Sequence, residues 1–211
     1  MATEILEKDE LTKILKVASN HVQKKQELIR DLDAACGDGD LGITVKRGFN
    51  AVKELLKDVE GLSISEVLKK AGLEFNTSAA STCGVLFATA FTKAGAEVKD
   101  KSTIELGDLR RMVDAAVKGI KHRGGAEVGD KTILDALVPA AEELSHAVGS
   151  NLSLEKGLKK AKEAAKTGAE NTMGMEPKTG RAKQLGGKSK EVQDPGATVV
   201  YLFLEGLASA I

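Results

Sequence analysis

The sequence has 211 residues, in which 31 lysines and arginines balance 31 aspartates and glutamates, and aromatic residues make up only 3%. Nucleic-acid-binding proteins usually carry a basic excess and aromatic side chains that stack on bases, so we expect no nucleic-acid partner. No stretch approaches the ~20 apolar residues that span a membrane, and the N-terminus lacks the apolar run of a signal peptide, so we expect a cytoplasmic protein without a membrane partner.

Apolar residues recur at helical spacing along most of the chain, and no segment alternates with period two for long enough to predict a strand. The segment Val199–Leu204 is apolar and β-branched, but the small residues that follow it favour a buried helix. About eight helices with short links predict an all-α fold, a single antiparallel helical domain over residues 1–211. A first helix is expected to include Ile5, Leu11 and Val17, a second Leu28 and Leu32, and a third Val45 and Leu56; the others are expected over 63–76, 84–97, 104–122, 131–148, 153–173 and 195–210.

Residues 174–193 do not fit this helical pattern, because they are polar, rich in glycine and contain five lysines and arginines. A loop this long in a compact domain is usually functional or disordered. Its composition predicts a basic cover over an anionic ligand, and an ordinary solvated loop is the alternative.

Three carboxylates lie close together in the sequence at Asp33, Asp38 and Asp40, interleaved with glycines and followed directly by a predicted helix. Mg²⁺ prefers carboxylate oxygens and keeps water and phosphate oxygens as its other ligands. The N-terminus of the next helix offers unpaired N–H groups to phosphate. The segment therefore predicts a magnesium–phosphate site, and a turn with aspartate caps is the alternative. An EF-hand is excluded because Phe49 stands at the twelfth loop position, and no Walker A loop is present.

Three further segments resemble pocket walls, because each is rich in small or hydroxyl residues and precedes a predicted helix. They are residues 78–84, 124–132 and 194–198. In the second, Asp130 is expected to cap the helix that follows; in the third, Asp194 is the expected cap and Pro195 occupies the favoured first helical position. Several such junctions at helix starts favour a common phosphate-binding end.

Four motifs, in this order and spacing, resemble the nucleotide-binding L subunits of the dihydroxyacetone kinase family: Gly37–Gly42, Gly129–Thr132, Gly180–Ala182 and Asp194–Ala197. The resemblance covers essentially the whole chain. It implies an eight-helix antiparallel barrel that binds ADP or ATP through two Mg²⁺ ions at one end, with residues 174–193 as a lid.

The resemblance also implies roles for individual residues. Arg181 is the implied catalytic residue, because an arginine neutralises charge on a transferred phosphoryl group. The implied magnesium ligands are Asp33, Asp38 and Asp40; the implied nucleotide-binding residues are Leu41, Gly42, Ile43, Thr44, Thr82 and Cys83 on the phosphate side, Gly124 and Ile133 on the adenine side, and Arg181, Asp194, Pro195 and Gly196 around them.

In this family the sugar is held by a separate K subunit, so the chain is expected to be half of a phosphotransferase. Three interpretations remain open: a subunit with resident ADP rephosphorylated by a phosphoenolpyruvate-dependent relay protein, an ATP-dependent triose or tetrose kinase subunit, and a regulatory module that reads nucleotide state. Leu41, Ala80–Ser81 and Cys83 depart from the residues common in the family, which leaves the sugar and the phosphate source open. The side chain of Leu41 cannot hydrogen-bond, so a phosphate contact there is expected to use its backbone N–H.

Overall fold

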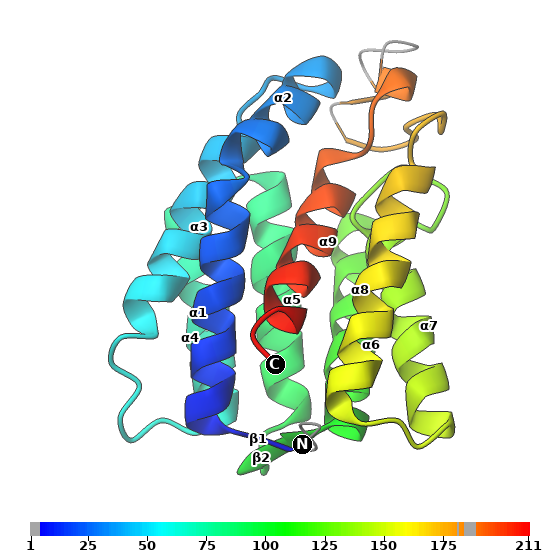
Figure 1. Ribbon diagram of the computed structural model, residues 1–211. Coiled ribbons are helices and arrows are strands. Elements are labelled where there is room, and N and C mark those ends of the chain that lie inside the picture. The colour runs from blue at the N-terminus through cyan, green and yellow to red at the C-terminus, as the bar shows by residue number, and fades with distance from the viewer. Residues whose placement is uncertain (1–4, 181, 184–188) are drawn as a thin grey trace.

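The computed structural model describes residues 5–180, 182–183 and 189–211. Within these residues the chain forms nine helices and two short strands (Figure 1). The helices are α1 (Lys8–Lys24), α2 (Gln26–Cys36), α3 (Leu41–Leu55), α4 (Ile64–Ser78), α5 (Thr82–Glu97), α6 (Leu106–Gly124), α7 (Leu134–Gly149), α8 (Leu154–Asn171) and α9 (Pro195–Ala208). None of these helices is both long enough and apolar enough to cross a lipid bilayer.

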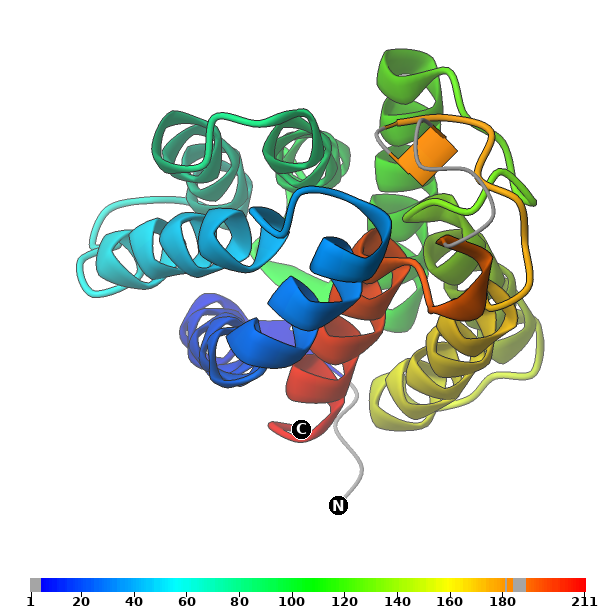
Figure 2. The same ribbon diagram turned by 90° about the horizontal axis from the view of Figure 1, so that it is seen from above.

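Eight of these helices form a closed antiparallel ring. Helix α1 packs against α3, each helix from α3 to α8 packs against the next one in the chain, and α9 packs back against α1 (Figure 2). The remaining helix, α2, has 11 residues and lies over one end of the ring, against α3 and α9. The all-α barrel expected from the sequence is therefore confirmed; the expected second helix, with Leu28 and Leu32, is α2 and lies outside the ring.

Two strands of three residues each lie at the opposite end of the ring, and the expectation that the chain has no strand is wrong. Strand β1 (Ile5–Glu7) pairs antiparallel with β2 (Thr103–Glu105), with Leu6 opposite Ile104. Only these two central side chains are buried, so each strand shows a single apolar inward residue. Three residues are too few to show the alternation of apolar and polar residues that predicts a strand. Ile5 and residues 104–105 were therefore expected to belong to helices.

All five phenylalanines of the sequence form one connected cluster in or against the hydrophobic core. Their rings contact one another from α3, α4, α5 and α9; Phe49 and Phe75 meet edge to face with centroids 5.1 Å apart. A Cβ atom at Gly48 would lie 2.5 Å from the Phe75 ring, so this glycine allows the contact. Edge-to-face aromatic pairs add to the free energy gained by burial. The apolar segment Val199–Leu204 lies within α9, as its sequence predicted.

Four helices, α3, α5, α7 and α9, begin at the end of the ring that α2 covers (Figure 1). Because the first N–H groups of a helix have no intrahelical partner, such an end carries partial positive charge. The arrangement confirms that several helix starts share one end and places the candidate site there.

Candidate functional site

Asp33, Asp38 and Asp40 come together where α2 leads into α3. Each contributes a carboxylate oxygen to a group in which these atoms lie within 4.8 Å of one another. The turn between them passes through Gly39, whose φ of 75° suits a residue without a side chain. Three carboxylates at this separation are hard oxygen donors of the kind that Mg²⁺ takes, so the donor set fits this ion.

The carboxylate of Asp33 also fixes the start of α3. Its Oδ2 accepts a hydrogen bond of 2.9 Å from the backbone N–H of Leu41. This N–H was expected to contact phosphate, but in the structure it donates to Asp33. The carbonyl of Asp40 accepts the N–H groups of Ile43 and Thr44, which begins the helix.

Helices α2 and α3 approach each other closely at Gly42. A Cβ atom there would lie 2.8 Å from both the Cβ of Arg30 and the carbonyl oxygen of Gln26. At Gly37, a Cβ atom would lie 2.7 Å from Oδ1 of Asp33. Gly42 is therefore required by the packing of α3 on α2, which carries Asp33, and Gly37 leaves room for the Asp33 carboxylate.

The start of α5 forms a second wall. The hydroxyl of Ser81 caps this helix by accepting the N–H of Gly84 at 3.0 Å. Next to it, Thr82 is exposed and Cys83 half-buried. Burial raises the pKa of the Cys83 thiol, and the negative charges of Asp194, Asp33 and Asp40 raise it further. Cys83 therefore lies near acids from both the α2–α3 turn and the start of α9.

The same neighbourhood includes Cys36, the last residue of α2. Burial raises the pKa of its thiol to about 12, and the charges of Asp194 and Asp33 act in the same direction. Both cysteines lie near the acids of the candidate site, and neither is a ready nucleophile, because reactivity requires the thiolate.

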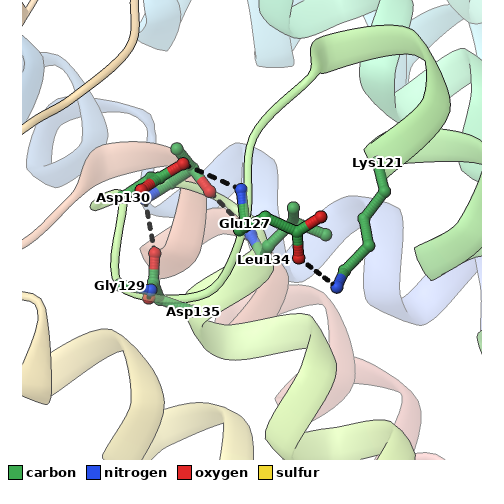
Figure 3. Close-up of polar contacts among 7 residues, drawn as sticks. Lys121, Glu127, Gly129, Asp130, Leu134 and Asp135 are labelled. Atoms are coloured by element: carbon green, nitrogen blue, oxygen red, sulfur yellow. Dashed lines mark hydrogen bonds and ion pairs between the residues drawn. The ribbon is translucent and has the colours of Figure 1, made fainter.

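The link between α6 and α7 is organised by Asp135, a buried residue that was not predicted from the sequence. Its carboxylate accepts the backbone N–H groups of Gly129 at 2.6 Å and Thr132 at 2.7 Å (Figure 3). The expectation that Asp130 caps α7 is wrong, because its carboxylate instead accepts the N–H of Glu127 and the ammonium of Lys178. Asp135 is hard to detect in the sequence because it follows the loop and resembles an ordinary first-turn acid.

Ile133 and Gly196 lie together across this junction, whereas Gly124 lies elsewhere on it. A Cβ atom at Gly196 would be 3.8 Å from the Cβ of Ile133, which is buried. Gly124, the last residue of α6, is exposed and faces Leu86 of α5. The structure therefore brings one predicted adenine-side residue against the start of α9.

Helix α9 begins as predicted, with Asp194 as its cap and Pro195 in its first turn. Oδ1 of Asp194 accepts the N–H of Ala197 at 2.7 Å. Burial raises the pKa of Asp194 to about 7, although this hydrogen bond and the nearby ammonium of Lys131 oppose the shift. Pro195 and Gly196 are buried behind it.

The remaining predicted residue, Arg181, lies outside the described residues. The described parts of the 174–193 segment contact the α6–α7 link. Lys178 donates to Asp130 from both its backbone N–H, at 3.2 Å, and its ammonium, at 3.1 Å. The N–H of Gly174 also donates to the carbonyl of Lys190 at 2.7 Å, which brings the two ends of the segment together.

The sequence model of the DAK2 domain matches residues 35–209. The chain belongs to the DAK2-domain family. The matched segment contains two of the three clustered acids, the junction around Asp135 and the start of α9. The family resemblance stated from the sequence motifs is therefore confirmed.

Several relatives of this DAK2-domain protein are kinases or kinase subunits. It is 36% identical over 186 residues to the "PEP-dependent dihydroxyacetone kinase, ADP-binding subunit DhaL" of Escherichia coli K12, covering 88% of this chain and 89% of that one. It is 32% identical to the "D-erythrulose kinase" of Mycolicibacterium smegmatis, covering 88% of this chain but 32% of the relative. The crystal structure of the dihydroxyacetone kinase from C. freundii "in complex with AMP-PNP and Mg2+" matches 95% of this chain and 33% of its own, with a TM-score of 0.73 and 25% identity.

Proposed function

We propose that this DAK2-domain protein is the ADP-binding subunit of a dihydroxyacetone kinase that uses phosphoenolpyruvate as its phosphate source. The observation that carries the proposal is the group of three carboxylates within 4.8 Å at an end where four helices begin. The near full-length similarity to the E. coli ADP-binding subunit supports the same assignment.

In this proposal Asp33, Asp38 and Asp40 hold two Mg²⁺ ions. When bound, these ions neutralise the charge of the nucleotide phosphates and of the group being transferred. The first turn of α3, residues 41–44, and the start of α5 at Thr82 and Cys83 face the phosphates with helix N-terminal dipoles.

The adenosine side of the nucleotide is assigned to the two junctions on the other half of the ring. Ile133 and Gly196 are neighbours there, and Asp194 and Pro195 form the start of α9 beside them. Gly124 and Arg181 are assigned from the family resemblance, Gly124 to the adenine and Arg181 to the transferred phosphoryl group.

The sugar is proposed to bind to a separate K subunit. The erythrulose kinase and the C. freundii kinase are about three times as long as the segment they share with this chain. The ADP-binding subunits instead match it over nearly their whole length. The chain is therefore expected to need a partner for phosphoryl transfer to dihydroxyacetone or a related short ketose.

A second candidate function is an ATP-dependent triose or tetrose kinase subunit, which the similarity to erythrulose kinase favours. The two functions differ in nucleotide exchange. Resident ADP stays bound while a relay protein rephosphorylates it, whereas an ATP-dependent subunit releases ADP in every cycle.

The test is Mg²⁺-dependent ADP binding, measured by calorimetry, in the wild type and in matched aspartate variants. Asp33→Asn, Asp38→Asn and Asp40→Asn each remove a charged ligand and are expected to weaken ADP binding at least tenfold. Asp31→Asn is the control, because Asp31 is an exposed residue of α2 whose carboxylate pairs with Arg30 outside the acidic group. Equal ADP affinity in all four variants would refute the metal site.

Native mass spectrometry and a transfer assay distinguish the two candidate functions. Co-purifying ADP, together with dihydroxyacetone phosphorylation that requires the phosphoenolpyruvate relay and a K subunit, supports the first. Phosphorylation with ATP and a K subunit alone supports the second.

A further inference from the structure

Lys131 has an unusual combination of backbone conformation and burial. Its φ is 60°, and it is one of two non-glycine residues with positive φ in the described part of the chain. A non-glycine residue in this region is uncommon, and the conformation persists only where the surroundings enforce it. Its side chain is 2% exposed, although it ends in an ammonium group.

The ammonium of Lys131 joins two segments that are distant in the sequence. Nζ donates to the carbonyl of Thr172 at 2.6 Å and to the carbonyl of Val192 at 2.7 Å. Thr172 is the cap residue at the C-terminus of α8, where a positive charge is favourable, and Val192 lies two residues before Asp194. A buried charge is stable only with such partners, so the ammonium and the two carbonyls hold one another in place.

A second hydrogen bond connects Thr172, one of the two residues bound by Lys131, to Asp194. The hydroxyl of Thr172, which is fully buried, accepts the backbone N–H of Asp194 at 2.7 Å. Lys131 therefore fixes the chain before Asp194 twice, directly at Val192 and through Thr172. On the far side, Gly196 lies against Ile133, two residues after Lys131.

From this geometry we propose that Lys131 is a positioning residue for the nucleotide site, which sets the place of Asp194–Gly196 against the α6–α7 link. The role rests on the proposed function. Lys131 acts through these residues, and its own ammonium is occupied by the two carbonyls. The chemical class of the ligand is a magnesium–nucleoside diphosphate or triphosphate.

The experiment compares Mg–ADP affinity in Lys131→Met with that in Lys121→Met. Lys121 lies at the same end of the barrel, but its ammonium forms a surface ion pair with Glu127 (Figure 3). Both variants are checked for native circular dichroism before calorimetry. Lys131→Met is expected to lose at least tenfold in affinity, and Lys121→Met less than twofold.

A merely structural lysine is distinguished by a double-mutant cycle with Asp194→Ala. If Lys131 acts by placing Asp194, its replacement in the Asp194→Ala background is expected to cost less than threefold in Mg–ADP affinity. Additive losses, or an affinity of Lys131→Met within twofold of wild type, would overturn the proposal. Absence of Mg–ADP binding in the wild type would instead overturn the proposed function, and this role with it.

If Lys131→Met does not fold, Thr172→Val provides the test. This variant keeps the ammonium and removes only the hydroxyl that accepts the Asp194 N–H. It is expected to weaken Mg–ADP binding at least threefold while the circular dichroism spectrum stays native. Unchanged affinity in this folded variant would overturn the proposed path through Thr172.

Discussion

Gly42→Ala is expected to push α2 away from α3 and thereby move Asp33 away from Asp38 and Asp40. The new Cβ atom would lie 2.8 Å from backbone and side-chain atoms of α2, at Gln26 and Arg30. Carbon contacts relax to about 3.5 Å, so α2 has to move by about 0.7 Å. Asp33 is carried by α2, whereas Asp38 and Asp40 are on the turn after it.

Such a displacement is large for a metal site, in which ligand distances are held to within about 0.2 Å. We therefore expect Mg–ADP affinity to fall about tenfold or more, a loss typical of disturbed ligand positions. Overpacking is also expected to destabilise the protein by about 1–3 kcal/mol. The measurements are calorimetry with Mg–ADP and urea unfolding.

The chain offers a closely matched control in Gly107. It is the second residue of α6, as Gly42 is of α3, and each follows a leucine. A Cβ atom at Gly107 would meet its nearest neighbour, the end of the Arg111 side chain, at 3.9 Å. Gly107→Ala gains the same helix propensity, at most about 1 kcal/mol, without a close contact. If both variants bind Mg–ADP equally well, the idea that Gly42 positions Asp33 is refuted.

Three other predictions follow from the site. Burial raises the pKa of Asp194 to about 7, so between its ordinary pKa of 3.8 and pH 7 the folded protein binds a proton that the unfolded chain releases. The unfolding free energy of the ligand-free protein, measured with urea, should therefore fall as pH rises from 5 to 8, and it should fall less in Asp194→Asn. The same pH dependence of this free energy in both proteins would contradict the prediction. Saturation with Mg–ADP at ~1,000 times its dissociation constant should add about 4 kcal/mol of stability, seen as a higher melting temperature that EDTA abolishes. Asp38→Asn should lose this rise while Asp31→Asn keeps it, and a rise in both would argue against the acidic group. Asp135→Asn replaces one of two buried acceptors of backbone N–H groups by a donor and should destabilise the protein by about 1–3 kcal/mol in urea unfolding, against no change for Asp31→Asn.

The sequence was most informative where a local pattern maps directly onto local structure. Helical spacing identified the long helices, and the cap at Asp194 forms as expected. The acids of the first motif were selected because Mg²⁺ prefers carboxylate oxygens, and a turn with aspartate caps was the alternative. In the structure, one carboxylate oxygen of each of these acids lies within 4.8 Å of the others.

The parts that sequence reasoning missed depend on distant segments. The pairing of β1 with β2 joins residues about 100 positions apart, and each strand has only three residues, too few to show a period-two pattern in the sequence. Lys131 lies within the Gly129–Thr132 motif, but its burial depends on the carbonyls of Thr172 and Val192, which are distant in the sequence. Its left-handed backbone also delays the start of α7 to Leu134, three residues later than the apolar pattern suggested.

The closure of the ring by α9 has a consequence for how the protein is made. Asp40 and Asp194 are about 150 residues apart in the chain, a separation that slows the formation of contacts. At a synthesis rate of ~5–20 residues per second, the face of α1 that receives α9 stays uncovered for roughly 10–40 seconds, and that of α8 for roughly 2–7 seconds. Only when α9 inserts between them do the acids near both ends of the sequence share one neighbourhood. If the proposed nucleotide site is correct, a nascent chain has no complete site before α9 docks, and a nucleotide that binds afterwards would hold the α2–α3 turn and the start of α9 together.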